Sequence, residues 1–247
     1  MLEKIEGIII RTQDYGETHK IITMFSKEKG KIAAIARGAK KPKSRMAAIT
    51  QPFVQGHFLL KIGSGLSALQ QGELEDSFRK IREDIVKTAY ASYIAELTDK
   101  LTEEKSADSH LYQQLIASLT AIVNEKDPEI VAMMYELKLY EKAGFAPIVQ
   151  RCAHCHSTDY LRSFSVTEGG LICQSCYVND ENTFIVNEKQ VYLLQLFTQV
   201  GIERIANISV KKENKEHMKK IMEAYYEQYG GLYIKSKKFL KQIDLFK

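Results

Sequence analysis

The sequence predicts an α+β protein, with an N-terminal OB-type β-barrel followed by an all-α helical domain that carries a four-cysteine module. Three observations support this fold class. Residues 1–80 contain short apolar runs rich in β-branched residues, and after Leu74 apolar residues recur every four positions. All four cysteines of the 247-residue chain fall between residues 152 and 176.

Five apolar runs in residues 1–80 are predicted to be β-strands. Glycine-containing turns separate them at residues 14–16, 29–30 and 63–65. A long interruption lies between the third and fourth runs, and this spacing suits a small five-stranded barrel of the OB type. The predicted strands are Ile5–Ile10, Ile21–Phe25, Ile32–Ala36, Phe53–Ile62 and Leu66–Leu74.

Helices are predicted for most of the remaining chain. Apolar residues four positions apart mark one buried stripe from Ile81 to Leu101, and a second helix is predicted over about 108–123. The third helix has Asp127 as N-cap, Pro128 in its first turn and Gly144 at its end. We therefore predict a barrel domain at residues 1–79 and a helical domain at residues 80–247. Two further helices are predicted at Asn187–Val200 and at about Lys212–Tyr229.

The four cysteines follow the pattern C-x2-C-x17-C-x2-C. Each C-x2-C pair forms a tight turn that directs two thiolates to one point, so two pairs complete a tetrahedron around Zn²⁺. Four thiolates leave no open coordination position for a reacting water, so the predicted zinc is structural. The predicted ligands are Cys152, Cys155, Cys173 and Cys176, in a zinc module at about residues 150–178.

Two histidines beside the first cysteine pair are alternative ligands. We expect His154 and His156 to be solvated, or to support the thiolates through hydrogen bonds, rather than to replace one of them. Disulfides are disfavoured, because the N-terminus carries charges where an export signal has its apolar stretch, and the cytoplasm keeps thiols reduced. No apolar run approaches the roughly 18–20 residues that cross a membrane. We therefore expect a cytoplasmic protein.

The formal net charge of +4 conceals an uneven distribution of charge. Residues 1–80 hold 14 Lys and Arg against 8 Asp and Glu, residues 81–210 hold 11 against 18, and residues 211–247 hold 10 against 5. A basic head and a basic tail around an acidic middle indicate a polyanionic partner, with nucleic acid as a candidate. Lysine-rich surface helices produce similar imbalances, so the distribution alone does not decide the partner.

The charge of the head is concentrated in residues 37–45, here called the basic segment. Gly38 and Pro42 prevent a regular helix there, so we expect a loop that follows the third strand. Its cations repel one another unless a bound anion offsets their charge, and they are suited to neutralise phosphates. The alternative to phosphate binding is a loop whose charges are only solvated. Tyr15 and Phe53 are candidates for stacking on bases, although a core position is the more common role for each. The five basic residues are Arg37, Lys40, Lys41, Lys43 and Arg45.

The sequence carries no pattern for nucleotide hydrolysis or for metal catalysis. It lacks the G-x4-G-K-[ST] phosphate loop, and Gly63 and Gly65 lack the third glycine and the following helix of a dinucleotide site. It also lacks H-E-x-x-H and the H-x-E element of zinc deaminases. We therefore predict no catalytic residue.

Several stretches, in the same order along nearly the whole chain, carry a resemblance to a known family. They are Gly7–Thr18 (GIIIRTQDYGET), Phe25–Lys31 (FSKEKGK), Ala36–Arg45 (ARGAKKPKSR), Gln51–Phe53 (QPF), Tyr135–Leu139 (YELKL) and Gly144–Pro147 (GFAP), which leads into Cys152. On these residues the chain resembles the bacterial recombination mediator RecO family. Members of that family vary in their cysteines, so the zinc prediction rests on the spacing in this sequence.

The resemblance implies an OB domain followed by a helical domain with a zinc module. It implies binding to single-stranded and double-stranded DNA and annealing of complementary strands at the bacterial nucleoid, without a covalent reaction. The implied partners are RecR and the acidic C-terminal tail of the single-strand-binding protein, with RecF and RecA in addition. On this chain the DNA contacts fall on the basic segment. The pocket for the tail is expected in the helical domain, at residues that the sequence does not identify.

Two other functions stay open at this point. A zinc-bearing adaptor that binds only protein would use its basic surface for an acidic partner. A metal-dependent nuclease or deaminase would need a carboxylate or histidine cluster beside an open metal, and the sequence shows none. DNA binding through five phosphate contacts predicts a log–log salt slope of about −3.5 on single strands, at about −0.7 per contact.

Overall fold

The computed structural model of the chain describes residues 1–63, 65–205 and 208–244. These residues pack into two compact units. The first contains Met1–Pro128 and the C-terminal segment that begins at Ile234, and the second contains Glu129–Tyr233. The predicted division into sequence domains between residues 79 and 80 stays a prediction. Among the described residues, no helix combines the length and the apolar character that spanning a membrane requires.

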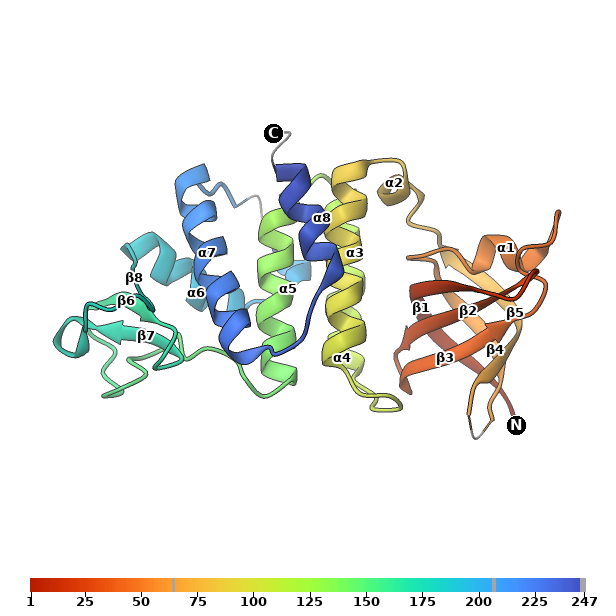
Figure 1. Cartoon of the computed structure of the whole chain (residues 1–247), viewed down its shortest axis with the longest axis horizontal. Coiled ribbons are helices and arrows are strands. Elements are labelled where there is room, and N and C mark those ends of the chain that lie inside the picture. Colours follow the sequence, from red (N-terminus) through yellow and green to blue (C-terminus); the bar gives the residue numbers. More distant parts are fainter. Residues whose placement is uncertain (64, 206–207, 245–247) are drawn as a thin grey trace. The chain divides into compact units, whose positions relative to one another are not determined.

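The predicted barrel is confirmed. Five strands close in the order β1-β2-β3-β5-β4, shown in red to orange in Figure 1, and neighbours are antiparallel except β3 and β5. The first strand continues past its predicted end at Ile10, because residues 2–8 pair with β4 and residues 7–15 pair with β2. A bulge between Ile9 and Arg11 bends it between these partners. The strands are β1 (Leu2–Tyr15), β2 (His19–Ser26), β3 (Gly30–Ala36), β4 (Gln55–Lys61) and β5 (Ser67–Asp76).

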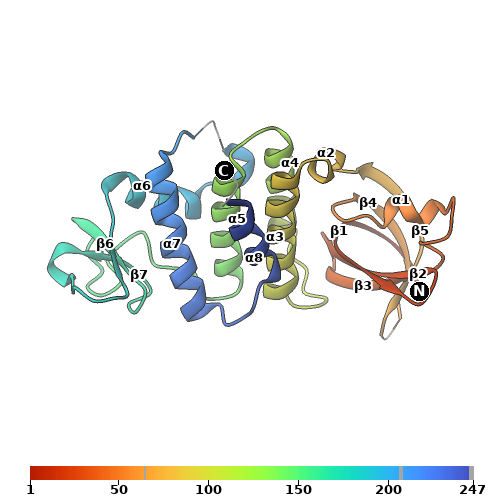
Figure 2. The same cartoon turned by 45° about the horizontal axis from the view of Figure 1, so that its top comes forward.

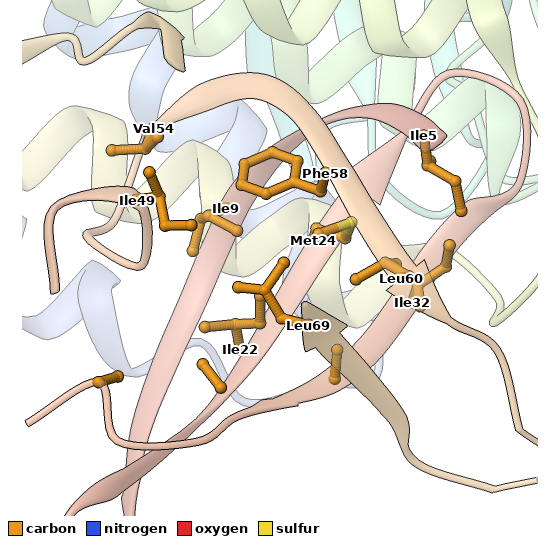
Figure 3. Packing of buried hydrophobic residues seen from close by; sticks show 13 residues of the cluster. Ile5, Ile9, Ile22, Met24, Ile32, Ile49, Val54, Phe58, Leu60 and Leu69 are labelled. Atoms are coloured by element: carbon orange, nitrogen blue, oxygen red, sulfur yellow. The ribbon is translucent and has the colours of Figure 1, made fainter. Parts of the chain in front are cut away.

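Apolar side chains from all five strands fill the barrel interior (Figure 3). Because successive side chains of a strand point to opposite faces, the residues that alternate with these interior residues face outward. The short helix α1 (Arg45–Ile49), which was not predicted, adds Ile49 to this cluster. The Ser44 hydroxyl caps α1 by accepting a hydrogen bond from the Met46 N–H at 3.2 Å. The largest strand residues of the cluster are Ile5, Ile9, Ile22, Met24, Ile32, Phe58, Leu60 and Leu69.

Most predicted helices are confirmed, with one break. The stripe from Ile81 to Leu101 is divided between two helices, because the Asp84 carboxylate accepts hydrogen bonds from the N–H groups of Val86 and Lys87 and starts a new helix. The other predicted helices lie within a few residues of their expected ends. The helices are α2 (Arg79–Arg82), α3 (Ile85–Leu101), α4 (Ser109–Val123), α5 (Pro128–Lys142), α6 (Glu188–Gln199) and α7 (Lys212–Tyr229).

Within the first unit, the barrel is joined to the end of α3. The Lys31 ammonium donates hydrogen bonds to the carbonyl oxygens of Asp99 and Thr102, and it lies 3.5 Å from the Asp99 carboxylate. Arg11 of β1 lies 3.4 Å from the same carboxylate. Beside Lys31, a Cβ on Gly30 would lie only 2.1 Å from the Ser106 carbonyl oxygen. Glycine at residue 30 therefore permits the close approach of β3 to the chain that follows α3.

The C-terminal helix α8 (Lys235–Asp244) was not predicted, and it lies beside α3 in both views (Figures 1 and 2). The Glu96 carboxylate of α3 caps its N-terminus. It accepts hydrogen bonds from the N–H groups of Lys235 at 2.9 Å and Ser236 at 2.7 Å, and from the Ser236 hydroxyl at 2.6 Å. Burial raises the pKa of Glu96, but these hydrogen bonds outweigh burial and lower it below its ordinary value.

We expect the Glu96→Ala variant to lose about 1–2 kcal/mol of unfolding free energy, because α8 loses its cap. Since the pKa of Glu96 is lowered by folding, its contribution is complete above the ordinary glutamate pKa of 4.5 and is lost as the pH falls through the folded-state value. Hydrogen exchange of the amides in residues 235–244, at pH 7 and at pH 4, measures both effects. The matched control is Glu103→Ala, which removes an exposed carboxylate of the same unit.

The second unit contains an antiparallel sheet in the order β7-β6-β8, which the all-α prediction for residues 80–247 did not include. Strands of three to five residues are too short to show the alternation that predicts a strand. Tyr229 of α7 donates a hydrogen bond to the Val166 carbonyl, and the ring of Tyr225 packs edge-on against Phe164. The sheet is therefore fastened to α7. Its strands are β6 (Leu161–Ser165), β7 (Gly170–Cys173) and β8 (Thr183–Ile185), and the 3-10 turns are η1 (Gln174–Cys176) and η2 (Ile202–Arg204).

Candidate metal centre and nucleic-acid interface

The two cysteine pairs are brought together by the β6–β7 hairpin. Cys173 ends β7, and Cys176 ends the η1 turn that follows it. The first pair, Cys152 and Cys155, is placed beside β7 by a hydrogen bond of 2.7 Å from the Ala153 N–H to the Leu171 carbonyl. The pairing that the sequence predicts is therefore present, and the four cysteines, all in the described part of the chain, form no disulfide.

The sulfur atoms have the spacing of a four-coordinate metal site. All four Sγ atoms lie within 4.8 Å of one another, and those of Cys155 and Cys173 are 3.7 Å apart. A tetrahedral Zn²⁺ with bonds of about 2.3 Å to sulfur separates its ligands by about 3.8 Å. The donor set is thus compatible with a metal ion. Cys152 and Cys173 are buried and Cys155 is exposed, so the site lies at the edge of the module.

The electrostatics of the cluster favour a cation. Burial opposes ionisation of the Cys152 thiol, but hydrogen bonds from the N–H groups of Cys155, Cys173 and His154 outweigh it and lower its pKa to about 6. Hydrogen bonding to Cys155, followed by burial, raises the pKa of Cys176 to about 12. Ionising all four thiols at these distances would bring like charges together, and a divalent cation would offset that repulsion.

The two histidines behave as expected from the sequence. His154 is exposed, and its Nδ1 atom lies 3.3 Å from a carboxylate oxygen of Glu168. His156 is also exposed, with a backbone φ of 64° in the turn after the first cysteine pair. In the described part of the chain, the residues placed to share a metal are the four cysteines, and this group includes neither histidine. The His154 ring contacts Glu168 and not the cysteine cluster.

The basic segment follows β3 and is an ordered turn rather than an extended loop. Ala39 is buried in the barrel core and anchors it. The Gly38 N–H donates to Nδ1 of His19 at 2.9 Å, and the Lys40 N–H donates to the Thr18 carbonyl at 3.0 Å. The tip of the β1–β2 hairpin therefore holds the segment in place. Neither contact with the hairpin could be predicted from the sequence, because the partner residues are about twenty positions apart.

Part of the repulsion among the five cations is relieved by a carboxylate of the protein itself. The Lys40 ammonium lies 2.7 Å from the Asp14 carboxylate of β1, and this hydrogen bond lowers the pKa of Asp14. The sequence did not identify Asp14 as the partner of Lys40, because Asp14 lies outside the basic segment. Within the described residues, the other four basic side chains have no ion pair, and all are exposed: Arg37, Lys41, Lys43 and Arg45.

The structure corrects the position expected for Arg45 and decides between the two roles considered for each aromatic residue. Arg45 belongs to α1 rather than to the loop, because Ser44 caps the helix just before it. Phe53 is only 4% exposed and cannot stack on a base, whereas Tyr15 is 50% exposed at the end of β1. With Lys40 held by Asp14, four available cations reduce the expected salt slope from about −3.5 to about −2.8.

Comparisons with known proteins point to one family. Residues 1–78 match the family model described as Recombination protein O N terminal, and residues 82–238 match the one described as Recombination protein O C terminal. The chain is 56% identical to the DNA repair protein RecO of Oceanobacillus iheyensis over 246 residues, which cover 100% of this chain and 95% of that relative. It is 46% identical to the DNA repair protein RecO of Bacillus cereus over 246 residues, which cover 100% and 99%.

Proposed function

The chain belongs to the RecO family of DNA repair proteins, and on that basis we propose that it is a mediator of homologous recombination that binds DNA through its basic segment. The proposed ligands are single-stranded and double-stranded DNA, and the proposed action is to anneal complementary strands without a covalent reaction. The observation that carries the proposal is the group of four exposed cations in residues 37–45 that have no ion pair among the described residues.

Annealing by such a surface is charge neutralisation. Two complementary strands repel each other through their phosphates, and a polycationic surface that contacts both strands lowers this repulsion. The contacts of the hairpin tip with Gly38 and Lys40 support this role, because a segment that is already ordered loses little conformational entropy when DNA binds. The charges are concentrated on one short turn, which suits contact with the phosphate backbone rather than readout of base sequence.

We further propose that the four-cysteine site holds a structural Zn²⁺ and that the protein works with others in the bacterial cytoplasm at the nucleoid. The distances between the sulfur atoms and the all-thiolate donor set support zinc. The proposed protein partners are RecR, the C-terminal tail of the single-strand-binding protein, RecF and RecA. RecA would be loaded onto DNA from which the single-strand-binding protein is displaced.

A strand-annealing assay tests this function. Two complementary oligonucleotides, one of them labelled, are mixed with and without single-strand-binding protein. We expect the protein to accelerate annealing under both conditions, since partner binding would let it act on coated strands. Annealing at the spontaneous rate, together with no binding to either strand, would contradict the proposal. That result would favour an adaptor that binds only protein.

A further inference from the structure

A surface hollow of about 530 Å³ lies on the outer face of the barrel, beside α1 and strands β1, β4 and β5. The strand register builds its floor. Lys4, Leu59 and Gln71 form one cross-strand row, and His57 and Glu73 are opposite each other in the next row. Side chains in such rows share one face of the sheet. The volume lies within the range of pockets that hold small ligands.

Helix α1 forms the wall of this α1 hollow. Gly72 of β5 lies beside the Ile49 side chain of the helix, because a Cβ at residue 72 would lie 2.7 Å from the Cδ1 atom of Ile49. Glycine therefore allows α1 to pack closely on β5, with Ile49 in the barrel core, as Figure 3 shows. That packing places Arg45 and Met46 of the same helix on the lining of the hollow.

The lining combines apolar and polar groups. Met46 and Leu59 are half-buried and offer an apolar surface, whereas the exposed Gln70 and Gln71 carry amides that both donate and accept hydrogen bonds. A flat ring with polar edges, such as a nucleobase, is complementary to an apolar surface bordered by amides.

The charge of the hollow favours an anion. Lys4 and Glu73 form an ion pair of 2.7 Å, so their charges offset each other. Arg45 also lines the hollow, and no carboxylate pairs with it within the described ranges. A guanidinium without a partner is suited to a phosphate, which it can contact through two parallel hydrogen bonds.

We propose that the α1 hollow holds one nucleotide of a single DNA strand, with its base against Met46 and Leu59 and its phosphate on Arg45. This inference rests on the proposed DNA binding. Arg45 is the last residue of the basic segment and also lines the hollow, so a strand held by the segment reaches the hollow without interruption. Bases of a duplex are stacked and paired, so the hollow selects single strands. OB folds commonly bind nucleic acid on the face formed by their second and third β-strands. The proposed contact in the α1 hollow is additional to that face.

The test compares an oligothymidylate of about 20 nucleotides with an abasic oligonucleotide of the same length, both labelled, by fluorescence anisotropy. We expect the protein to bind the oligothymidylate about 5-fold or more tightly than the abasic strand, because a seated base adds stacking and apolar contact. Leu59→Asn replaces part of the apolar surface with a polar amide and should remove most of that difference. The matched control is Leu74→Asn, at an exposed position of β5 outside the hollow, and it should keep the difference.

Equal affinity for the two strands, or a difference that Leu59→Asn leaves intact, would overturn the inference while DNA binding stands. No affinity for either strand would instead refute the proposed function. If Leu59→Asn does not fold, a strand containing 5-iodouracil is photo-crosslinked to the unaltered protein. The expected crosslinks fall on peptides that contain Met46, His57 or Gln71, and crosslinks confined to other segments would contradict the inference.

Discussion

Reversing the charge of Lys41 and Lys43 together, as Lys41→Glu with Lys43→Glu, is expected to weaken single-strand binding on the order of 50-fold at about 50 mM salt. Each of these exposed lysines is available to one phosphate, and each lost contact removes about 0.7 from the log–log salt slope. If the two proteins bind DNA equally at about 1 M salt, where screening is strong, the smaller slope of the variant lowers its relative affinity by about 50-fold at about 50 mM salt. Fluorescence anisotropy with a labelled strand measures it.

Two further variants show whether position, rather than total charge, is responsible. Lys189→Glu with Lys220→Glu makes the same change in net charge at exposed positions outside the basic segment, and we expect it to alter affinity only slightly. Lys40→Gln should also have a small effect, because Lys40 is already paired with Asp14. An equal loss of affinity in the two double variants, with a smaller loss in Lys40→Gln, would mean that DNA responds only to the overall charge.

Replacing one of the proposed zinc ligands, as Cys173→Ser, is expected to release the metal and to unfold the cysteine module locally. Structural zinc contributes about 10–16 kcal/mol to the folding of isolated zinc-finger peptides, so three thiolates should not retain both metal and fold. The buried position of Cys173 at the end of β7 makes it part of the small core of the module. Metal analysis should find about one equivalent of zinc before the substitution and almost none after it.

Hydrogen exchange separates local from global unfolding in that variant. Amides of residues 152–185 should lose protection, whereas those of the barrel, in the other compact unit, should keep it. The control is His154→Ala, because the His154 ring faces Glu168 and lies outside the ligand group, and it should retain the metal. A Cys173→Ser protein with full metal content and unchanged exchange would refute a structural role for the site.

Patterns that are local in sequence predicted the larger elements correctly. The barrel strands were predicted from β-branched runs between glycine turns, and α5 from Asp127 and Pro128 at its start and Gly144 after its end. The cysteine cluster was predicted because ligand spacing alone constrains two C-x2-C pairs to one metal. These features depend on residues within a few positions of each other, which a single sequence displays directly.

Features that depend on distant partners were not predicted. The Glu96 carboxylate caps α8 across the intervening helices, and Asp14 pairs with Lys40 from another strand. The sheet β7-β6-β8 and the helix α1 are too short to show a period, and the packing of Ile49 against Gly72 exists only in the folded barrel. The α1 hollow is therefore a property of the tertiary structure.

The central claim, that four unpaired cations of the basic segment hold DNA by its phosphates, is tested most directly by a salt titration of binding to labelled single-stranded DNA. We predict a log–log slope of about −2.8 for the unaltered protein and of about −1.4 for Lys41→Glu with Lys43→Glu. Equal slopes for the two proteins, or binding that does not depend on salt, would contradict the claim.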